Sequence, residues 1–135
     1  MCMKRIYTLV AVLCLAAFLT SVFMQAQSDT TVICPVGGCH SVQSSVYGRI
    51  LGIQNIMYGM LGFGVLFLLA AMQRIERNTL RDAVLIAGCT LAGLMALWFI
   101  SVQVFILHEY CAFCLLVDGI SIILLVLGVL LFSRR

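Results

Sequence analysis

Charged residues are scarce in this sequence. Only 10% of the 135 residues are charged, and the chain contains a single proline. A soluble domain carries about 25% charged residues, so this composition excludes a protein with an ordinary water-exposed surface. What is abundant instead is apolar sequence, at 64% of the residues. The net charge of +3 is too small to indicate a nucleic-acid partner, and we therefore expect membrane lipid to be the surroundings.

Four apolar segments are long enough to cross the hydrocarbon core of a bilayer, which takes about 20 residues. They comprise residues 6–24, 53–72, 83–107 and 112–132. None contains proline, and Asp118 is the only charged residue inside them. Because a segment in lipid must satisfy its own backbone hydrogen bonds, each is predicted to be a helix. We predict a single domain over residues 1–135 with an all-α integral membrane fold, a four-transmembrane-helix bundle.

The first segment has an alternative interpretation as a signal peptide. It follows Lys4 and Arg5, and Met24-Gln25-Ala26 resembles a cleavage site. The hydrophobic region of a signal peptide has about 7–15 residues, and this segment is longer. We expect it to be retained as a membrane helix.

The basic residues predict an orientation. All of them except Arg49 lie on one side of the predicted spans: Lys4, Arg5, Arg74, Arg77, Arg81, Arg134 and Arg135. An excess of Lys and Arg marks the cytoplasmic side. We expect a multi-pass protein of the plasma (inner) membrane with both termini in the cytoplasm, which places residues 25–52 on the outer face.

Four of the seven cysteines form two close pairs on that outer face. Cys34 and Cys39 lie in the loop, and Cys111 and Cys114 open the fourth span. The second pair is a CxxC at a helix N-terminus, where backbone N–H groups and the helix dipole favour the thiolate. Two pairs in an oxidising compartment suit a relay, in which the loop pair meets a protein thiol and the helix pair meets a lipid-soluble acceptor such as a quinone.

Two other interpretations of the cysteines remain open. They can form a structural zinc site, with His40 as a further candidate ligand, although zinc sites usually have closer spacing in both halves. They can also form two inert disulfides. In either case the chain would be a non-catalytic membrane scaffold or a zinc-binding subunit. We favour the relay and predict no metal site.

The outer loop is predicted to contain a short interfacial helix. After Cys39, apolar residues recur at helical spacing: Val42, Val46, Tyr47, Ile50 and Leu51. Polar residues take the opposite face, as in a helix that lies flat on a membrane-embedded bundle.

Residues 39–53 and 111–116 together resemble the vitamin K epoxide reductase family in its prokaryotic, stand-alone form. The resemblance covers essentially the whole chain and implies a quinone-dependent thiol oxidase that supports disulfide formation. It implies that Cys34 meets the partner's thiol, that Cys39 passes electrons to Cys111, and that Cys114 reduces a quinone of the ubiquinone, menaquinone or vitamin K type. Many prokaryotic members carry a fused thioredoxin-like domain, whereas this chain ends at Arg135, so a separate thioredoxin-fold partner is implied.

The resemblance also suggests residues for the quinone pocket. Ser45 occupies the family's serine position, and Asn55 matches an asparagine that bonds the quinone in some members. We expect Tyr58 to border the same pocket. Asp118 departs from the family pattern and lies one helical turn beyond Cys114. An acid within the bilayer is a functional candidate, so we hypothesise that Asp118 handles a proton, the alternative being a structural pairing with Asn55 or Gln103.

Overall fold

The computed structural model describes residues 2–27 and 38–134, and Cys34 lies outside them. The described chain is built on four long α-helices: α1 (Cys2–Gln27), α3 (Asn55–Ile75), α4 (Thr79–Ser101) and α5 (Ala112–Ser133). α4 continues directly into a π-helical turn, η2 (Val102–Leu107). Each of the four is long and apolar enough to cross a membrane. The predicted all-α membrane fold with four spanning helices is confirmed.

The helices begin and end within a few residues of the predicted spans, and local capping explains the differences. α4 begins at Thr79, before the apolar sequence starts, because the Asn78 side chain accepts a hydrogen bond from the Leu80 N–H. Such a cap satisfies one of the free N–H groups of a first turn. α3 begins at Asn55 rather than 53, since the two preceding residues belong to a strand.

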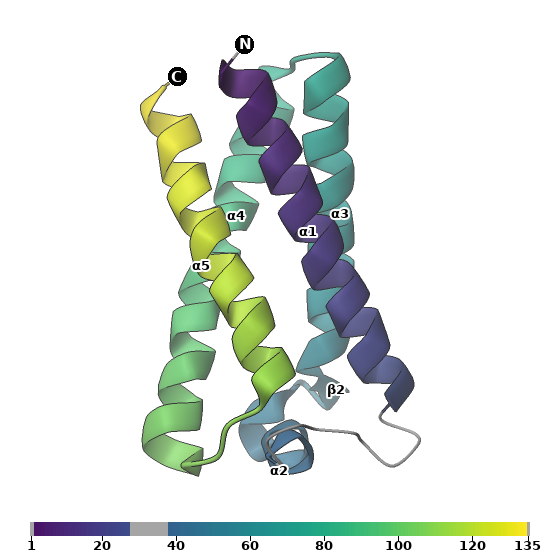
Figure 1. Cartoon of the computed structure of the whole chain (residues 1–135), viewed down its shortest axis with the longest axis vertical. Helices are drawn as coiled ribbons and strands as arrows, with labels where there is room; N and C mark the ends of the chain where they lie inside the picture. The colour runs from purple at the N-terminus through teal and green to yellow at the C-terminus, as the bar shows by residue number, and fades with distance from the viewer. Residues whose placement is uncertain (1, 28–37, 135) are drawn as a thin grey trace.

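The bundle places its ends in a definite arrangement. α1 packs mainly along α3, and α4 packs along α5. The start of α1 and the end of α5 lie at one end of the bundle, while α2 and β2 lie at the other (Figure 1). The segment that contains Cys39 therefore sits at the same end as the start of α5, which carries Cys111 and Cys114.

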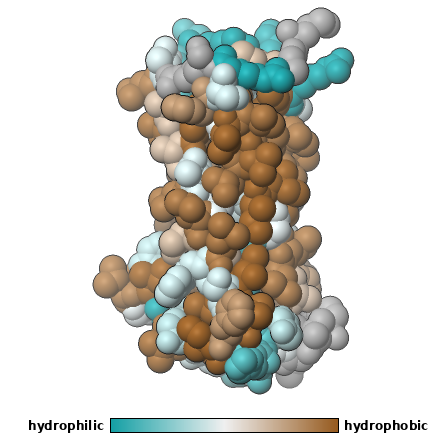
Figure 2. All heavy atoms as spheres, turned by 90° about the vertical axis from the view of Figure 1, so that its left-hand side faces the viewer, coloured by the Kyte–Doolittle hydropathy of each residue, from teal (hydrophilic) through white to brown (hydrophobic). Residues whose placement is uncertain are grey.

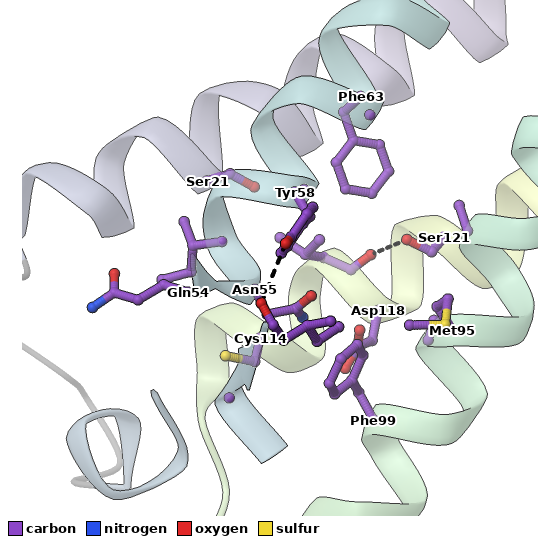
Figure 3. A pocket seen from close by; sticks show the side chains of 18 of the residues that line it. Ser21, Gln54, Asn55, Tyr58, Phe63, Met95, Phe99, Cys114, Asp118 and Ser121 are labelled. Atoms are coloured by element: carbon purple, nitrogen blue, oxygen red, sulfur yellow. Dashed lines mark hydrogen bonds between the residues drawn. The ribbon is translucent and has the colours of Figure 1, made fainter. Parts of the chain in front are cut away.

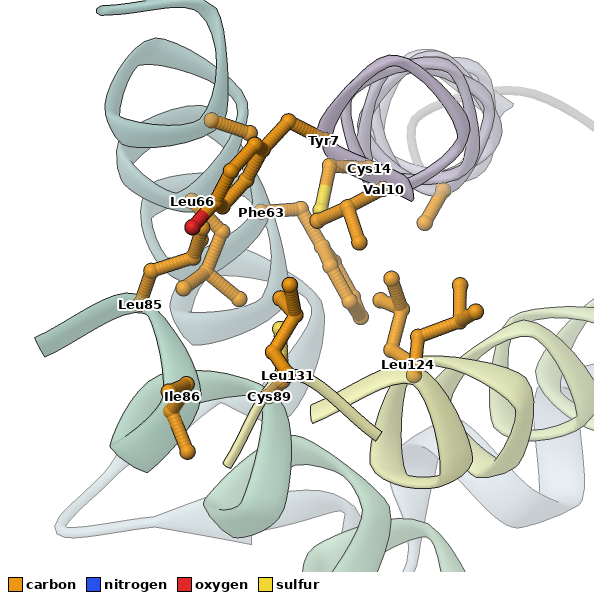
Figure 4. Packing of buried hydrophobic residues seen from close by; sticks show 13 residues of the cluster. Tyr7, Val10, Cys14, Phe63, Leu66, Leu85, Ile86, Cys89, Leu124 and Leu131 are labelled. Atoms are coloured by element: carbon orange, nitrogen blue, oxygen red, sulfur yellow. The ribbon is translucent and has the colours of Figure 1, made fainter. Parts of the chain in front are cut away.

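A continuous apolar core joins the four long helices (Figure 4). Its largest fully buried side chains include Tyr7, Leu85, Leu124 and Leu131. Polar residues gather at the end of the molecule that carries the start of α1, and apolar side chains form a broad band over the middle (Figure 2). An apolar band between polar ends is the surface expected of a protein surrounded by lipid.

The outer loop is less helical than predicted. A helix forms only over α2 (Cys39–Ser44), followed by a 3₁₀ turn, η1 (Val46–Gly48), and an antiparallel hairpin of β1 (Arg49–Ile50) and β2 (Ile53–Gln54). The prediction of a helix through Leu51 was therefore wrong.

Two local features stop that helix. Ser45 is extended, and its hydroxyl donates to the Val42 carbonyl and accepts from the Gly48 N–H. Leu51 and Gly52 then have φ of 54° and 81°. Two successive residues with positive φ form the tight turn that joins short hairpin strands. Helical spacing of apolar residues does not reveal either feature.

Candidate functional site

The structure brings one cysteine of each predicted pair into contact. The Sγ atoms of Cys39 and Cys111 are 3.1 Å apart, and both residues are fully buried. Cys39 is disulfide-bonded, whereas Cys111 and Cys114 are free thiols. Cys34, the predicted partner of Cys39, lies outside the described residues. A free thiol in contact with a disulfide sulfur is the arrangement from which thiol–disulfide exchange starts.

Apolar side chains surround this sulfur contact. Cys39 and Cys111 form a buried cluster with Met24 of α1, against which Val42, Ile56, Phe113 and Cys114 pack. The rings of Phe23 and Phe113 close the side toward α1, with centroids 5.6 Å apart. The two sulfurs are therefore shielded from solvent.

A close backbone contact sets the position of Cys39. Gly38 lies directly against the backbone of Tyr110, so close that a Cβ on Gly38 would be 2.5 Å from the Tyr110 carbonyl oxygen. Gly38 also accepts, through its carbonyl, a hydrogen bond from the Val42 N–H in the first turn of α2. The residue before Cys39 thus rests on the residue before Cys111, and only glycine fits between them.

Cys111 is the N-cap of α5. Its Sγ accepts a hydrogen bond from the Cys114 N–H at 3.3 Å. The Cys114 thiol and the backbone N–H groups of Cys114 and Phe113 lower the pKa of the Cys111 thiol from 9.0 to about 7, against the opposing effect of burial. The thiolate is the reactive form of a cysteine, so the lowered pKa favours reactivity of Cys111 near neutral pH.

Gln103, in η2, connects Cys111 to Asp118. Its Oε1 accepts from the Cys111 N–H at 3.1 Å, and its Nε2 donates to Asp118 Oδ2 at 3.4 Å. Both Gln103 and Asp118 are buried. The pairing of Asp118 with Gln103 that was one alternative from the sequence is present, but Asp118 also faces a cavity.

That cavity has a volume of about 710 Å³ and is bounded by all four long helices, by η2 and by the outer loop. Its wall is mainly apolar, and it holds few polar groups (Figure 3). Cys114 and Asp118 both line it from α5, and Asn55 lines it from the first turn of α3. A large apolar pocket with a few polar groups is the usual form of a site for a small organic ligand.

All four residues predicted for the pocket line this cavity, but two of them use their hydroxyl protons elsewhere. Ser45 donates to the Val42 carbonyl at 2.7 Å. Tyr58 donates to the Ile50 carbonyl at 3.2 Å, which ties α3 to the hairpin. Of the four predicted residues, Asn55 and Asp118 keep polar atoms for a ligand, and Gln54, whose buried Oε1 has no hydrogen-bond partner among the described residues, also lines the cavity.

Some features of the site were not predicted from the sequence. The second hydrogen bond of Gln103, to Cys111, was missed, and so was the π-helical turn that carries it. The only sequence signal was a glutamine near the end of an otherwise apolar span. The contact between Gly38 and Tyr110 was also missed, since the spacing of cysteines does not encode it.

Metal ligation finds no support in the described residues. Nowhere in residues 2–27 and 38–134 do three His, Cys, Asp or Glu side chains lie close enough to hold a metal ion.

Comparison with known proteins assigns the chain to a family. No curated protein matches the chain. The sequence model described as "Vitamin K epoxide reductase family" matches residues 5–129, which is nearly the whole chain. The chain thus belongs to the vitamin K epoxide reductase family and is a membrane-embedded oxidoreductase.

Proposed function

We propose that this protein is a quinone-dependent thiol oxidase that forms disulfides in a thioredoxin-fold partner. The observation that carries the proposal is the 3.1 Å contact between the Sγ atoms of Cys39 and Cys111, with Cys114 lining the adjacent cavity. The three residues form a continuous route from the outer loop to a pocket within the bundle.

The first transfer begins outside the bundle. The dithiol of the partner reduces the Cys34–Cys39 disulfide through a mixed disulfide on Cys34, and the partner leaves oxidised. Two electrons then reside on Cys34 and Cys39 as thiols. This assignment follows from the family and from the burial of Cys39, which leaves its sulfur inaccessible to another protein.

The second transfer takes place at the sulfur contact. The Cys39 thiolate attacks Cys111 of the Cys111–Cys114 disulfide, and Cys114 leaves as the thiolate. Cys34 then attacks Cys39, which re-forms Cys34–Cys39 and releases Cys111 as the thiolate. The exchange ends with the Cys34–Cys39 disulfide re-formed and with Cys111 and Cys114 as thiols.

The cavity fits a quinone as the final acceptor. A quinone ring and the start of its isoprenoid tail are apolar, as is most of the cavity wall. Asn55 would hold a ring carbonyl through its amide, and Cys114 would supply electrons. When bound there, a quinone would accept two electrons and two protons as Cys111 and Cys114 close their disulfide.

We propose that Asp118 supplies a proton in this step. Its carboxyl group lines the same cavity as Cys114 and lies one helical turn away on α5. In an apolar site a carboxyl group can hold a proton and then give it up. We assign to Asp118 the transfer of one proton toward the reduced quinone.

The charge distribution supports an outward-facing site. Arg74, Arg77 and Arg81 lie around the connection between α3 and α4, at the end of the bundle opposite α2 (Figure 1). By the positive-inside rule that end is cytoplasmic. We propose that the protein lies in the plasma (inner) membrane with both termini in the cytoplasm and the cysteines on the outer face, where the compartment is oxidising.

Trapping tests the proposed route. Purified Cys39→Ala protein, in which Cys34 is a lone thiol, is mixed with an oxidised thioredoxin-fold protein, whose disulfide the Cys34 thiolate attacks, and is analysed on non-reducing gels. We expect a mixed disulfide that disappears when Cys34 is also replaced. Cys89→Ala, a free buried cysteine of the core, serves as the matched control and should give no adduct. Absence of any adduct with Cys39→Ala, together with tightly bound zinc in the wild type, would overturn the proposal in favour of a structural role.

A further inference from the structure

We propose, building on the thiol-oxidase function above, that Gln103 is a positioning residue that couples the quinone pocket to the disulfide-exchange site. It does so by fixing the orientation of the Asp118 carboxyl group and the position of the Cys111 backbone through the two ends of one amide. Asp118 lines the cavity and Cys111 touches Cys39, so the side chain of Gln103 spans from one site to the other.

The orientation of the Gln103 amide is determined by its partners. The Cys111 N–H can only donate, so the Gln103 carbonyl oxygen must face it, at 3.1 Å. The amide NH₂ group then necessarily faces Asp118 Oδ2, at 3.4 Å. Gln103 is 2% exposed, and therefore water cannot readily replace either partner. If the amide were flipped, its NH₂ group would face the Cys111 N–H donor and its oxygen would face the Asp118 carboxylate, so neither hydrogen bond could form.

This orientation decides which oxygen of Asp118 carries a proton. Oδ2 accepts from the Gln103 amide, and a proton placed there would oppose that donor. Oδ1 has no hydrogen-bond partner among the described residues, and the residue lines the cavity. Gln103 therefore leaves Oδ1 as the oxygen that binds and releases the proton.

The π-helical turn η2 explains how Gln103 reaches both groups. A π-turn adds a residue to each helical turn and rotates the side chains that follow. Gln103 is the second residue of η2, and the segment ends at His108, whose φ of 50° turns the chain back toward α5. Such turns recur at functional sites, and here the turn directs the one polar side chain of η2 into the interior.

The test compares two neutral replacements of Asp118 in a Cys34→Ala background. In that background, once stoichiometric diamide has oxidised the purified protein to a single disulfide, the Cys39 thiol exchanges with the Cys111–Cys114 disulfide, and acid quenching traps the Cys39–Cys111 mixed disulfide without any quinone or partner. Asp118→Asn and Asp118→Leu both remove the charge, but only asparagine keeps an acceptor for the Gln103 amide. We expect the trapped fraction to fall about five-fold in Asp118→Leu relative to Asp118→Asn, which is the size of one hydrogen bond.

The same pair is then compared in a Gln103→Met background. If Gln103 carries the coupling, the difference between the Asp118 replacements disappears when methionine is present. Equal trapped fractions in the presence of Gln103, or a difference that persists with methionine, would overturn the inference. Size-exclusion profiles of the variants in detergent show whether each is folded before trapping.

The outcome is separable from that of the proposed function. Trapping within the chain requires no quinone, so it reports on Gln103 even when the wild type reduces none. A wild type that reduces no quinone but shows the Gln103-dependent difference would overturn the oxidase assignment and retain the coupling. A wild type that reduces quinone but shows no Gln103-dependent difference would overturn the coupling and retain the oxidase assignment.

Discussion

Replacement of Gly38 by alanine should uncouple the two cysteine pairs without unfolding the protein. The backbone of Gly38 has φ of −89° and ψ of −1°, a conformation that non-glycine residues adopt at the third position of type I turns. The effect is therefore steric alone. The added Cβ would be 2.5 Å from the Tyr110 carbonyl oxygen, where an ordinary contact is about 3.5 Å.

The size of the effect follows from that overlap. Both partners are backbone atoms, so relief requires the segments to separate by about 1 Å. The Sγ atoms of Cys39 and Cys111, now 3.1 Å apart, would move out of contact. A misplacement of about 1 Å at reacting atoms can slow a reaction roughly 100-fold, and we expect a fall of that order in the exchange rate.

The assay is acid-quenched thiol trapping in the Cys34→Ala background, followed over time. Gly119→Ala is the matched control, because a Cβ there meets no atom within 4 Å. It should exchange at the parent rate. Gly38→Ala protein that exchanges as fast as the control would show that the Gly38–Tyr110 contact has no part in aligning the sulfurs.

Three further predictions concern Cys111, the hairpin and the opposite end of the bundle. The pKa of the Cys111 thiol is about 7, so its thiolate is lost as the pH falls below 7, and closure of the disulfide with its CxxC partner should slow from pH 8 to pH 6. Thiolate absorbance near 240 nm, with Cys111→Ser as the blank, should show a midpoint near 7. A midpoint near 9 would contradict the assignment. Tyr58→Phe removes the hydrogen bond to the Ile50 carbonyl and loosens the hairpin that bounds the cavity. The KM for a short-chain ubiquinone should therefore rise several-fold with little change in kcat. A fall in kcat alone would show instead that Tyr58 takes part in the chemical step. Tyr7→Phe removes the buried 2.6 Å hydrogen bond to Asp82 and should cost about 1–3 kcal/mol of stability, measured as a lower unfolding temperature in detergent. A large loss of disulfide exchange at temperatures where the variant is folded would show instead that this distant end affects the site.

The sequence was sufficient to predict the helices because lipid imposes a simple rule on composition. Segments of about 20 apolar residues without proline have few alternatives to a spanning helix. The placement of Cys39 and Cys111 at one end followed from counting the spans between them. The thiolate-stabilising start of α5 was likewise predictable, since Cys111 directly precedes a long apolar run.

The details of the outer loop were not predictable in the same way. Apolar spacing after Cys39 favoured a helix through Leu51, yet the hydroxyl of Ser45 and the positive φ of Leu51 and Gly52 produce a turn and a hairpin. These features depend on single side-chain hydrogen bonds and backbone angles, and periodicity averages over both. Local polar interactions thus override the pattern wherever the chain leaves the bilayer.

The connections within the site were also hidden in the sequence. Gln103 and Cys111 are joined by a hydrogen bond only because η2 and the turn at His108 bring them together. The apposition of Gly38 and Tyr110 joins segments far apart in the chain. Such contacts depend on how the bundle packs, which composition and spacing do not specify.

The most direct test of the account is quinone reduction coupled to oxidation of a thioredoxin-fold protein. Purified protein is mixed with the reduced partner and a short-chain ubiquinone, and quinone absorbance is followed alongside partner thiols. We predict that one quinone is reduced for each dithiol oxidised, that Cys114→Ala abolishes the reaction, and that Cys89→Ala retains it. Quinone turnover that survives in Cys114→Ala, or a wild type that oxidises the partner without consuming quinone, would contradict the central claim that electrons leave the protein through Cys114.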